Sequence, residues 1–412
     1  MLAVTSVCAS TAWSQPVGEP VLQTSPGPGS RPGRIRLGPF YLNPWFRISS
    51  IGLDNNVLYT AEDRQADISA SGGPGLDITL PIKRASRFYT KGYLDYLFFL
   101  RTESQRRLTW GAATGLVLGG QRTHFGVEES YSTSFGRPSF EVDDRIEQQA
   151  EQTTGDLSRR LFWRIGVTLG GLRARVKTGS GQEFLGTDLA RTLTRDDYRA
   201  RFGLTYAISV KSSFVVEGER QWSRFPNDPG RDAAWDRLAV GFRTDATALI
   251  SGELLGGVRY YRPERATSPE TRSAYVGVNA AWNATPKTRF PFAYTRDRAY
   301  SAFSTSGTPT VRTEALSLGL DKELRQRLDT RLFARRTRFV TDGEITVDIP
   351  DQGPVTAVRE DRTWEYGADL GYLVRPKLRI GVAASYTDRD STISYFGIEG
   401  LLVGMTVRYN PD

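Results

Sequence analysis

The feature that most constrains this chain is a two-residue alternation of apolar and polar side chains, clearest between Lys377 and Tyr409. On either side of a short polar turn, apolar or aromatic residues occupy every second position: Leu378, Ile380, Val382, Ala384 and Tyr386, then Leu401, Val403, Met405, Val407 and Tyr409. A period of two places one set on each face of a β-strand. The interleaved face carries Arg379 and Arg408 and suits the wall of a watery lumen better than a protein core. Such alternation indicates a transmembrane β-barrel, although a hairpin of a soluble β-sandwich would also alternate.

The whole-chain totals narrow the class of protein. The chain has 412 residues, of which 24% are charged, and a mean hydropathy of −0.40. No run approaches the roughly 18 consecutive apolar residues of a membrane-spanning helix, which excludes an α-helical membrane protein. A low mean hydropathy is compatible with a barrel because half of each strand faces water.

Residues that carry chemistry are scarce. The single cysteine, Cys8, and the single histidine, His124, leave little for disulfides, thiolate metal sites or imidazole catalysis. We therefore expect no metal site, no cofactor and no enzymatic activity, with His124 beside a short turn at the periplasmic rim. Asp54-Asn55-Asn56 could bind Ca²⁺, but an Asx-turn is the favoured interpretation. The net charge of +8 comes from arginines spread along the strands, so we expect no nucleic-acid partner.

The N-terminal segment differs from the rest of the chain. Residues 1–15 are interpreted as a remnant signal peptide, with Ala12-Trp13-Ser14 as a small-x-small cleavage signature, or else as a disordered tail. Residues 16–38 are rich in proline and glycine, which predicts a disordered periplasmic linker. Residues 39–412 are then predicted to form one barrel in the outer membrane of a Gram-negative bacterium.

Connections of two lengths join the alternating segments. Short ones are Pro81–Ser86, Val210–Ser213, Thr244–Thr247, Asn283–Thr288 and Val374–Lys377, and long polar ones are Asp54–Gln65, Phe135–Asp143, Lys177–Ala190, Pro226–Ala234, Pro263–Glu270, Asp297–Pro309 and Thr341–Asp361. Short periplasmic turns and long extracellular loops are typical of outer-membrane barrels. The segments predict an all-β fold, a single antiparallel barrel of about 18 strands with both termini in the periplasm. Sixteen strands is the alternative.

Two sets of side chains are candidate functional residues. The alternation predicts a lumen lined by Arg164, Arg199, Arg201, Glu217, Glu219, Arg237, Arg243, Glu253, Arg259, Arg331, Arg335, Asp369 and Arg379. Charges there can pair across strands simply to stiffen the wall, or the arginine excess can favour anions. Tryptophans near strand ends predict an interfacial aromatic girdle of Trp110, Trp163, Trp222, Trp282 and Trp364.

The chain resembles the bacterial outer-membrane proteins grouped as the putative β-barrel porin-2 family. The resemblance lies in the proline- and glycine-rich lead, the strand Trp45–Leu53, and the Asp54-Asn55-Asn56 element that follows it, where Leu53 replaces the family's usual aromatic residue. It implies an outer-membrane barrel without known catalysis, often associated with exopolysaccharide export or surface assembly. The association with export or assembly rests on analogy with other family members and is not a physical argument from these residues.

These observations favour a porin-like channel that passes or exports a polar or anionic solute such as polysaccharide. The alternative is a non-conducting structural, assembly or surface-binding barrel with a plugged lumen. Expected partners are outer-membrane lipid, lipopolysaccharide, the barrel-assembly machinery and a polysaccharide export system. The solute, the pore radius and the choice between monomer and trimer stay open.

Overall fold

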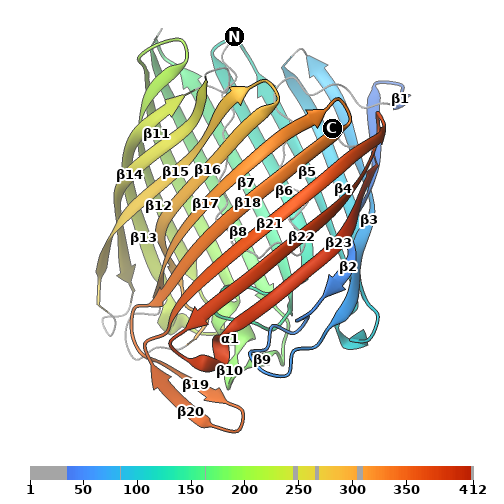
Figure 1. Cartoon of the computed structure of the whole chain (residues 1–412). Coiled ribbons are helices and arrows are strands. Elements are labelled where there is room, and N and C mark those ends of the chain that lie inside the picture. The colour runs from blue at the N-terminus through green and yellow to red at the C-terminus, as the bar shows by residue number, and fades with distance from the viewer. Residues whose placement is uncertain are drawn as a thin grey trace.

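The computed structural model describes residues 35–83, 85–162, 164–244, 249–264, 269–303 and 310–409. Within these residues eighteen antiparallel strands form one closed barrel, with tilted strands around a common axis (Figure 1). They are β2 (Phe40–Asp54), β3 (Asp67–Lys83), β4 (Ser86–Phe99), β5 (Arg107–Gly119), β6 (Thr123–Gly136), β7 (Ile146–Arg160), β8 (Ile165–Thr178), β11 (Arg195–Ala207), β12 (Ser212–Arg224), β13 (Ala233–Thr244), β14 (Ile250–Pro263), β15 (Thr271–Thr285), β16 (Thr288–Tyr300), β17 (Thr310–Arg325), β18 (Leu328–Thr341), β21 (Glu360–Arg375), β22 (Leu378–Ser391) and β23 (Ile398–Tyr409). The prediction of an all-β barrel of 18 strands is confirmed.

The barrel closes where its first and last strands pair. Phe46 of β2 lies opposite Tyr409 of β23, and the pairing continues to Asp54 opposite Leu402. A short strand, β1 (Ile35–Leu37), folds back on the start of β2 through a turn at Gly38, whose φ of 61° suits glycine. Residues 35–37 are therefore a strand, in contrast to the disordered linker expected there. The expected signal remnant and the rest of that linker lie outside the described residues.

The two rims differ in the length of their connections. Eight turns of two to five residues lie at the rim that holds β1 and the end of β23, whereas the long connections lie at the opposite rim (Figure 1). The long loops contain η2 (Glu103–Gln105), β9 (Glu183–Phe184), β10 (Thr187–Asp188), α1 (Leu189–Leu193), η3 (Pro229–Arg231), β19 (Ile345–Ile349), β20 (Gly353–Ala357) and η4 (Ser394–Phe396). The described residues contain no helix that is long and apolar enough to cross a membrane.

Every second residue of a strand points away from the lumen, and most of these outward residues are apolar, which makes the outer wall apolar. From β11 to β21 the outward positions carry even numbers, and Leu238, Leu254 and Leu370 are about half exposed there. A soluble protein would bury such side chains, so this wide apolar surface indicates contact with lipid.

Aromatic side chains fill part of the lumen where a neighbouring strand carries glycine. A Cβ added at Gly367 would lie 2.2 Å from Cε1 of Phe333, and one added at Gly111 would lie 2.5 Å from Cε1 of Tyr93. The rings thus lie flat against the opposite backbone, which requires glycine at these positions.

Candidate functional site in the barrel lumen

A cavity of about 740 Å³ lies inside the barrel. Strands β4–β8 and β11–β18 supply most of its lining, and residues 137–145, which connect β6 to β7, border it at the long-loop rim. We call residues 137–145 the mouth loop. On β8 the lining includes Thr168, Gly170, Gly171 and Ala174, so small side chains face this part of the cavity.

Arginines of three strands, β11, β13 and β14, meet at one carboxylate of β12 in the cavity wall. Nitrogen atoms of Arg199, Arg237 and Arg259 lie 3.9, 3.2 and 3.6 Å from the Glu219 carboxylate oxygens. The strand register explains two of these contacts, because Glu219 of β12 lies opposite Arg237 of β13, which lies opposite Arg259 of β14. One acid therefore holds several guanidinium groups together on the inner wall.

A second set of contacts extends this charged wall toward the short-turn rim. Arg243 lies 2.6 Å from Glu253 and 3.6 Å from Glu217. Nearer the long-loop rim, Arg259 also pairs with Asp297 at 3.1 Å. With Arg199, Arg201 and Arg237 the wall holds five arginines and four carboxylates, so its excess of positive charge is small.

Arg201 differs from the other arginines of this wall. Within the described residues it has no ion pair, and its Nε lies about 3.4 Å from where a Cβ at Gly170 would be. Its guanidinium thus extends past Gly170 on β8 and interacts with the Asp156 carboxylate at longer range.

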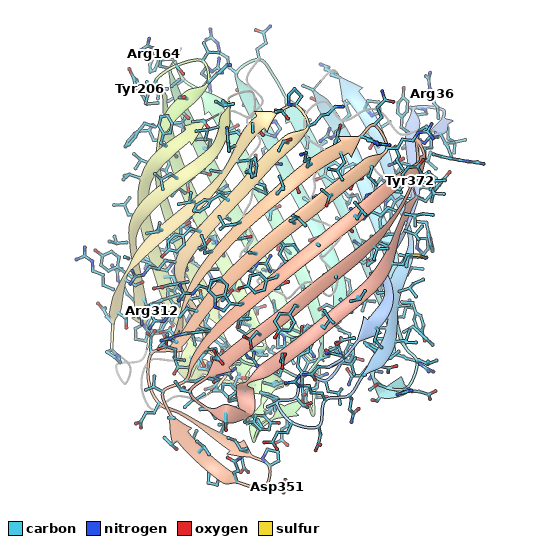
Figure 2. The ribbon with its side chains drawn as sticks, viewed as in Figure 1. Arg36, Arg164, Tyr206, Arg312, Asp351 and Tyr372 are labelled. Atoms are coloured by element: carbon cyan, nitrogen blue, oxygen red, sulfur yellow. The ribbon has the colours of Figure 1, made fainter. Side chains whose placement is uncertain are left out.

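The structure divides the residues that the sequence predicted to line the lumen. Eight of them line the cavity: Arg199, Arg201, Glu217, Glu219, Arg237, Arg243, Glu253 and Arg259. Arg331, Arg335, Asp369 and Arg379 occupy inward positions farther along the wall, where they form ion pairs such as Arg335–Glu365 at 3.1 Å. Arg164 lies instead in the turn before β8, where it donates to the outward Tyr206 hydroxyl at 3.5 Å (Figure 2). Turn residues no longer follow the alternation of a strand, which explains this difference.

The predicted tryptophan girdle falls at two levels on the outer wall. Trp110, Trp222 and Trp364 lie near the long-loop ends of their strands, and Trp282 lies near a short turn. Trp364 is stacked on Tyr366 at 5.9 Å, and Trp282 on Phe290 at 5.1 Å. Trp163 lies outside the described residues.

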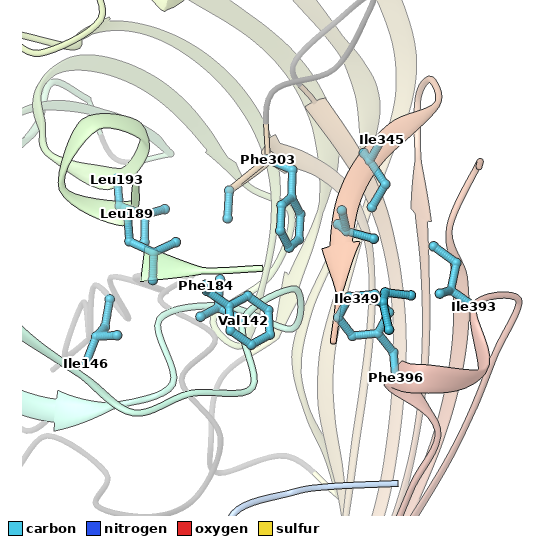
Figure 3. Close-up of a cluster of buried hydrophobic side chains, with 12 residues drawn as sticks. Val142, Ile146, Phe184, Leu189, Leu193, Phe303, Ile345, Ile349, Ile393 and Phe396 are labelled. Carbon is cyan, nitrogen blue, oxygen red and sulfur yellow. The ribbon is translucent and has the colours of Figure 1, made fainter. Parts of the chain in front are cut away.

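A hydrophobic core covers the mouth of the barrel, and the sequence reasoning missed it. Five long loops contribute its buried side chains, which pack together in Figure 3: Val142, Ile146, Phe184, Leu189, Leu193, Ala302, Phe303, Ile345, Val347, Ile349, Ile393 and Phe396. We call these residues the loop core. Alternating Ile345, Val347 and Ile349 within a long polar loop were the available sequence signal.

The mouth loop spans the lumen to reach the far wall. Glu141 accepts hydrogen bonds from the Ser301 hydroxyl at 2.6 Å and the Ala302 amide at 2.5 Å, both just after β16. Six strands, β8 and β11–β15, separate β7 from β16 along the wall. At its other end, Arg137 donates to the Val57 carbonyl at 3.2 Å. The loop is therefore fixed on both sides of the opening.

Burial strongly affects the charged groups of the mouth loop. Loss of water raises the pKa of Glu141, against the hydrogen bonds from Ser301 and Ala302 that lower it. Burial, followed by repulsion from Arg137, lowers the pKa of Arg145 to about 9. These directions mark the loop as a place where protonation and packing are coupled.

The other two candidates, the Asp54-Asn55-Asn56 element and His124, do not form a metal-binding or catalytic arrangement within the described residues. Asp54 accepts from the Asn56 amide at 2.9 Å, which confirms the Asx-turn, and no cluster of possible metal ligands occurs among the described residues. His124 lines the cavity near the short-turn rim, opposite Ser158 on β7. Within the described part of the chain, no hydrogen bond joins His124 to Ser158 or to the nearby Asp156.

Several solved outer-membrane proteins have a similar architecture. They include the siderophore receptor PirA from Pseudomonas aeruginosa (TM-score 0.46, 10% identity, 91% of this chain and 81% of that one). Another is OpdL from Pseudomonas aeruginosa (TM-score 0.45, 13% identity, 90% of this chain and 99% of that one). A third is OccAB3 from Acinetobacter baumannii (TM-score 0.46, 11% identity, 89% of this chain and 98% of that one). No curated protein sequence matches this chain significantly.

A family model settles the relationship. The model described as Putative beta-barrel porin 2 matches residues 135–410, about two thirds of the chain. The match begins after the Trp45–Tyr59 region on which the resemblance was first recognised, and covers the mouth loop together with the arginine-bearing strands. The chain therefore belongs to this family of porin-like outer-membrane β-barrels.

Proposed function

We propose that the protein is an outer-membrane channel for a polar solute, with a preference for anions such as acidic polysaccharide. The observation that carries the proposal is the lumen wall where Arg199, Arg237 and Arg259 surround Glu219 while Arg201 extends into the cavity. Charges at close quarters in a narrow passage favour ions of the opposite sign.

The mouth loop and the loop core make this a gated channel. A solute that enters from the long-loop rim meets a packed layer in place of an open lumen. Passage therefore requires the loops to move, and loops are the elements whose rearrangement most often controls access. The same layer supports the second candidate function, a non-conducting structural or surface-binding barrel with a closed mouth.

A flux assay separates the two functions. Liposomes that contain the refolded protein are given neutral or acidic oligosaccharides of equal length, and solute entry is followed by swelling. The channel proposal expects entry of both, with faster entry of the acidic sugar at low ionic strength, where charge effects are least screened. Swelling no faster than in protein-free liposomes, with folded protein present, would support the closed barrel.

A further inference from the structure

The outer wall carries a concentrated group of arginines at one level of the barrel. On β15–β18, outward positions beyond the apolar stretch hold Arg272, Arg296, Arg298, Arg312, Arg336 and Arg338. We call these six residues the arginine belt. Their even numbers place them on the face that carries Leu318 and Leu332, both nearly half exposed. Arg312 is labelled near the long-loop rim in Figure 2.

The arginine belt has an uncompensated positive charge. Arg296 pairs with Glu314 at 3.5 Å, Arg298 with Asp342 at 3.1 Å, and Arg338 with Glu360 at 3.0 Å. Within the described residues, Arg272, Arg312 and Arg336 have no ion pair. Three of the six guanidinium groups thus have no carboxylate partner.

The strand register places like charges directly opposite each other. Arg298 of β16 is the cross-strand partner of Arg312 of β17. Like charges in such a pair destabilise a sheet. The Arg298 side chain is only 12% exposed and pairs with Asp342, so Arg312 is the member of this pair that can reach a ligand. An anion that binds at Arg312 would offset this repulsion.

Two of the unpaired arginines are positioned by aromatic rings. The guanidinium carbon of Arg272 lies 5.4 Å from the Tyr260 ring centroid, and that of Arg336 lies 5.4 Å from the Trp364 ring centroid. Stacking on a ring fixes the plane of a guanidinium and leaves its N–H edge free to donate. This edge matches the paired oxygens of a phosphate group.

The other end of the same wall has a different character. Near the short turns the outward positions include Trp282, Phe290 and Tyr372, which stack or face lipid. The long-loop rim faces the cell exterior in barrels of this kind. The arginine belt therefore lies at the level of the outer-leaflet headgroups, directly above the level of their acyl chains.

We propose that the arginine belt is a binding site for lipopolysaccharide, with its guanidinium groups on the lipid A phosphates. This ligand combines a phosphorylated sugar head with several acyl chains, so it matches the belt and the apolar wall beneath it at once. The proposal does not depend on whether the lumen conducts. The arginine belt is on the outer wall of the barrel, whereas the proposed channel is in the lumen.

Lipid binding to the refolded protein in detergent micelles tests the proposal. The probes are bisphosphorylated lipid A and the same lipid after enzymatic removal of its phosphates, detected by native mass spectrometry. The test variant is R272Q/R312Q/R336Q, which removes the three unpaired cations. The matched control is R325Q/R327Q/R375Q, which removes three exposed arginines at the short-turn rim of the same region. Heat-modifiable gel migration shows that each variant is folded.

The belt predicts tight binding of the bisphosphorylated lipid to the native protein and to the control variant. The test variant should bind it about a hundredfold more weakly, because each arginine near an anionic surface contributes roughly a factor of five to ten. Equal affinity for the phosphorylated and dephosphorylated lipids would overturn the proposal. The proposal would also be overturned if free inorganic phosphate, at the same concentration as the lipid, displaced bound lipid A as well as lipid A itself does. A test variant that loses self-association but still binds lipid A normally would overturn it too.

Discussion

The Arg359 guanidinium and the Asp361 carboxylate form an ion pair at 2.6 Å in which both side chains are almost fully buried, at 0% and 2% exposed. The same guanidinium donates to the carbonyls of Phe140 and Glu141 at 3.2 and 3.0 Å. It also lies over the Phe396 ring of the loop core, 3.4 Å from the centroid. Through Arg359, the start of β21 is thus tied to the mouth loop and to the loop core.

Asp361→Asn is expected to free the mouth loop while leaving the barrel folded. The substitution leaves the buried Arg359 charge without its closest anion, a change that costs about 3–5 kcal/mol. Amide hydrogen exchange in residues 137–145 should then be at least about a hundredfold faster. Asp228→Asn is the control, because its partner Arg191 is 62% exposed and such a pair contributes less than about 1 kcal/mol. Equal exchange in the two variants would show that the buried pair does not hold the loop.

Acid is expected to strengthen the closed mouth. Burial raises the pKa of Glu141 above its unfolded value near 4.5, so the folded form binds a proton more tightly than the unfolded form. The stabilisation is complete below about pH 4.5 and is lost as pH rises through the raised pKa. Arg359 and Arg231 are the charged groups that face Glu141 and oppose the raise.

The measurement is mouth-loop hydrogen exchange, corrected for intrinsic rates, between pH 5 and pH 8. Protection should decrease as pH rises in the native protein. Glu141→Gln should flatten this dependence, because a glutamine amide can still accept from Ala302 and donate to the Ser301 hydroxyl. If the pH dependence of protection were the same in the variant, protonation of Glu141 would not be its cause.

Arg201→Glu is expected to reduce or reverse the anion preference of the lumen. The change replaces a cation that forms no close ion pair by an anion that would repel the nearby Asp156 carboxylate. Reversal potentials under a KCl gradient should shift toward cation selectivity at about 0.1 M salt and converge with the native value near 1 M, where the Debye length is only about 3 Å. Arg331→Glu is the comparison, since Arg331 lies outside the cavity lining and pairs with Asp321 at 2.8 Å. Similar shifts of the reversal potential in both variants would mean that Arg201 does not determine the anion selectivity of the lumen.

Gly367→Val is expected to destabilise the barrel through its contact with Phe333. A Cβ at Gly367 would lie 2.2 Å from the ring, so the ring must leave its position against the backbone. Overpacking of this kind costs about 1–3 kcal/mol, which should lower the urea concentration at which the barrel unfolds in micelles. Phe333→Ala in the same chain should recover part of the loss, and additive effects of the two substitutions would refute a direct contact.

Much of the fold was predictable because a barrel repeats one local rule. Alternation in segments such as Tyr198–Ile208 fixes which side chains face lipid, and the lengths of the connections assign the two rims. The charged partners are harder to predict, since they depend on strand register. Arg201, Arg237 and Arg259 share a row with Glu219 only because of how β11–β14 pair.

The mouth could not be predicted from local patterns. Glu141 meets Ser301 across 160 residues, and Arg359 meets Phe140 across 219. These contacts follow from the closure of the barrel, which brings distant loops to one opening. Long loops are polar on average, and Phe396 or Ile345 within them gives no indication of its partners until the loops are placed together.

The most direct test of the channel account is the single-channel conductance of the native protein and the Asp361→Asn variant in planar lipid bilayers. The account predicts long closed periods and ohmic, anion-selective openings for the native protein. The variant should show openings of the same size that last longer, because its mouth loop is no longer held. If both proteins are folded and inserted yet neither conducts, the lumen is not a pathway, and the protein is the closed barrel of the second candidate function.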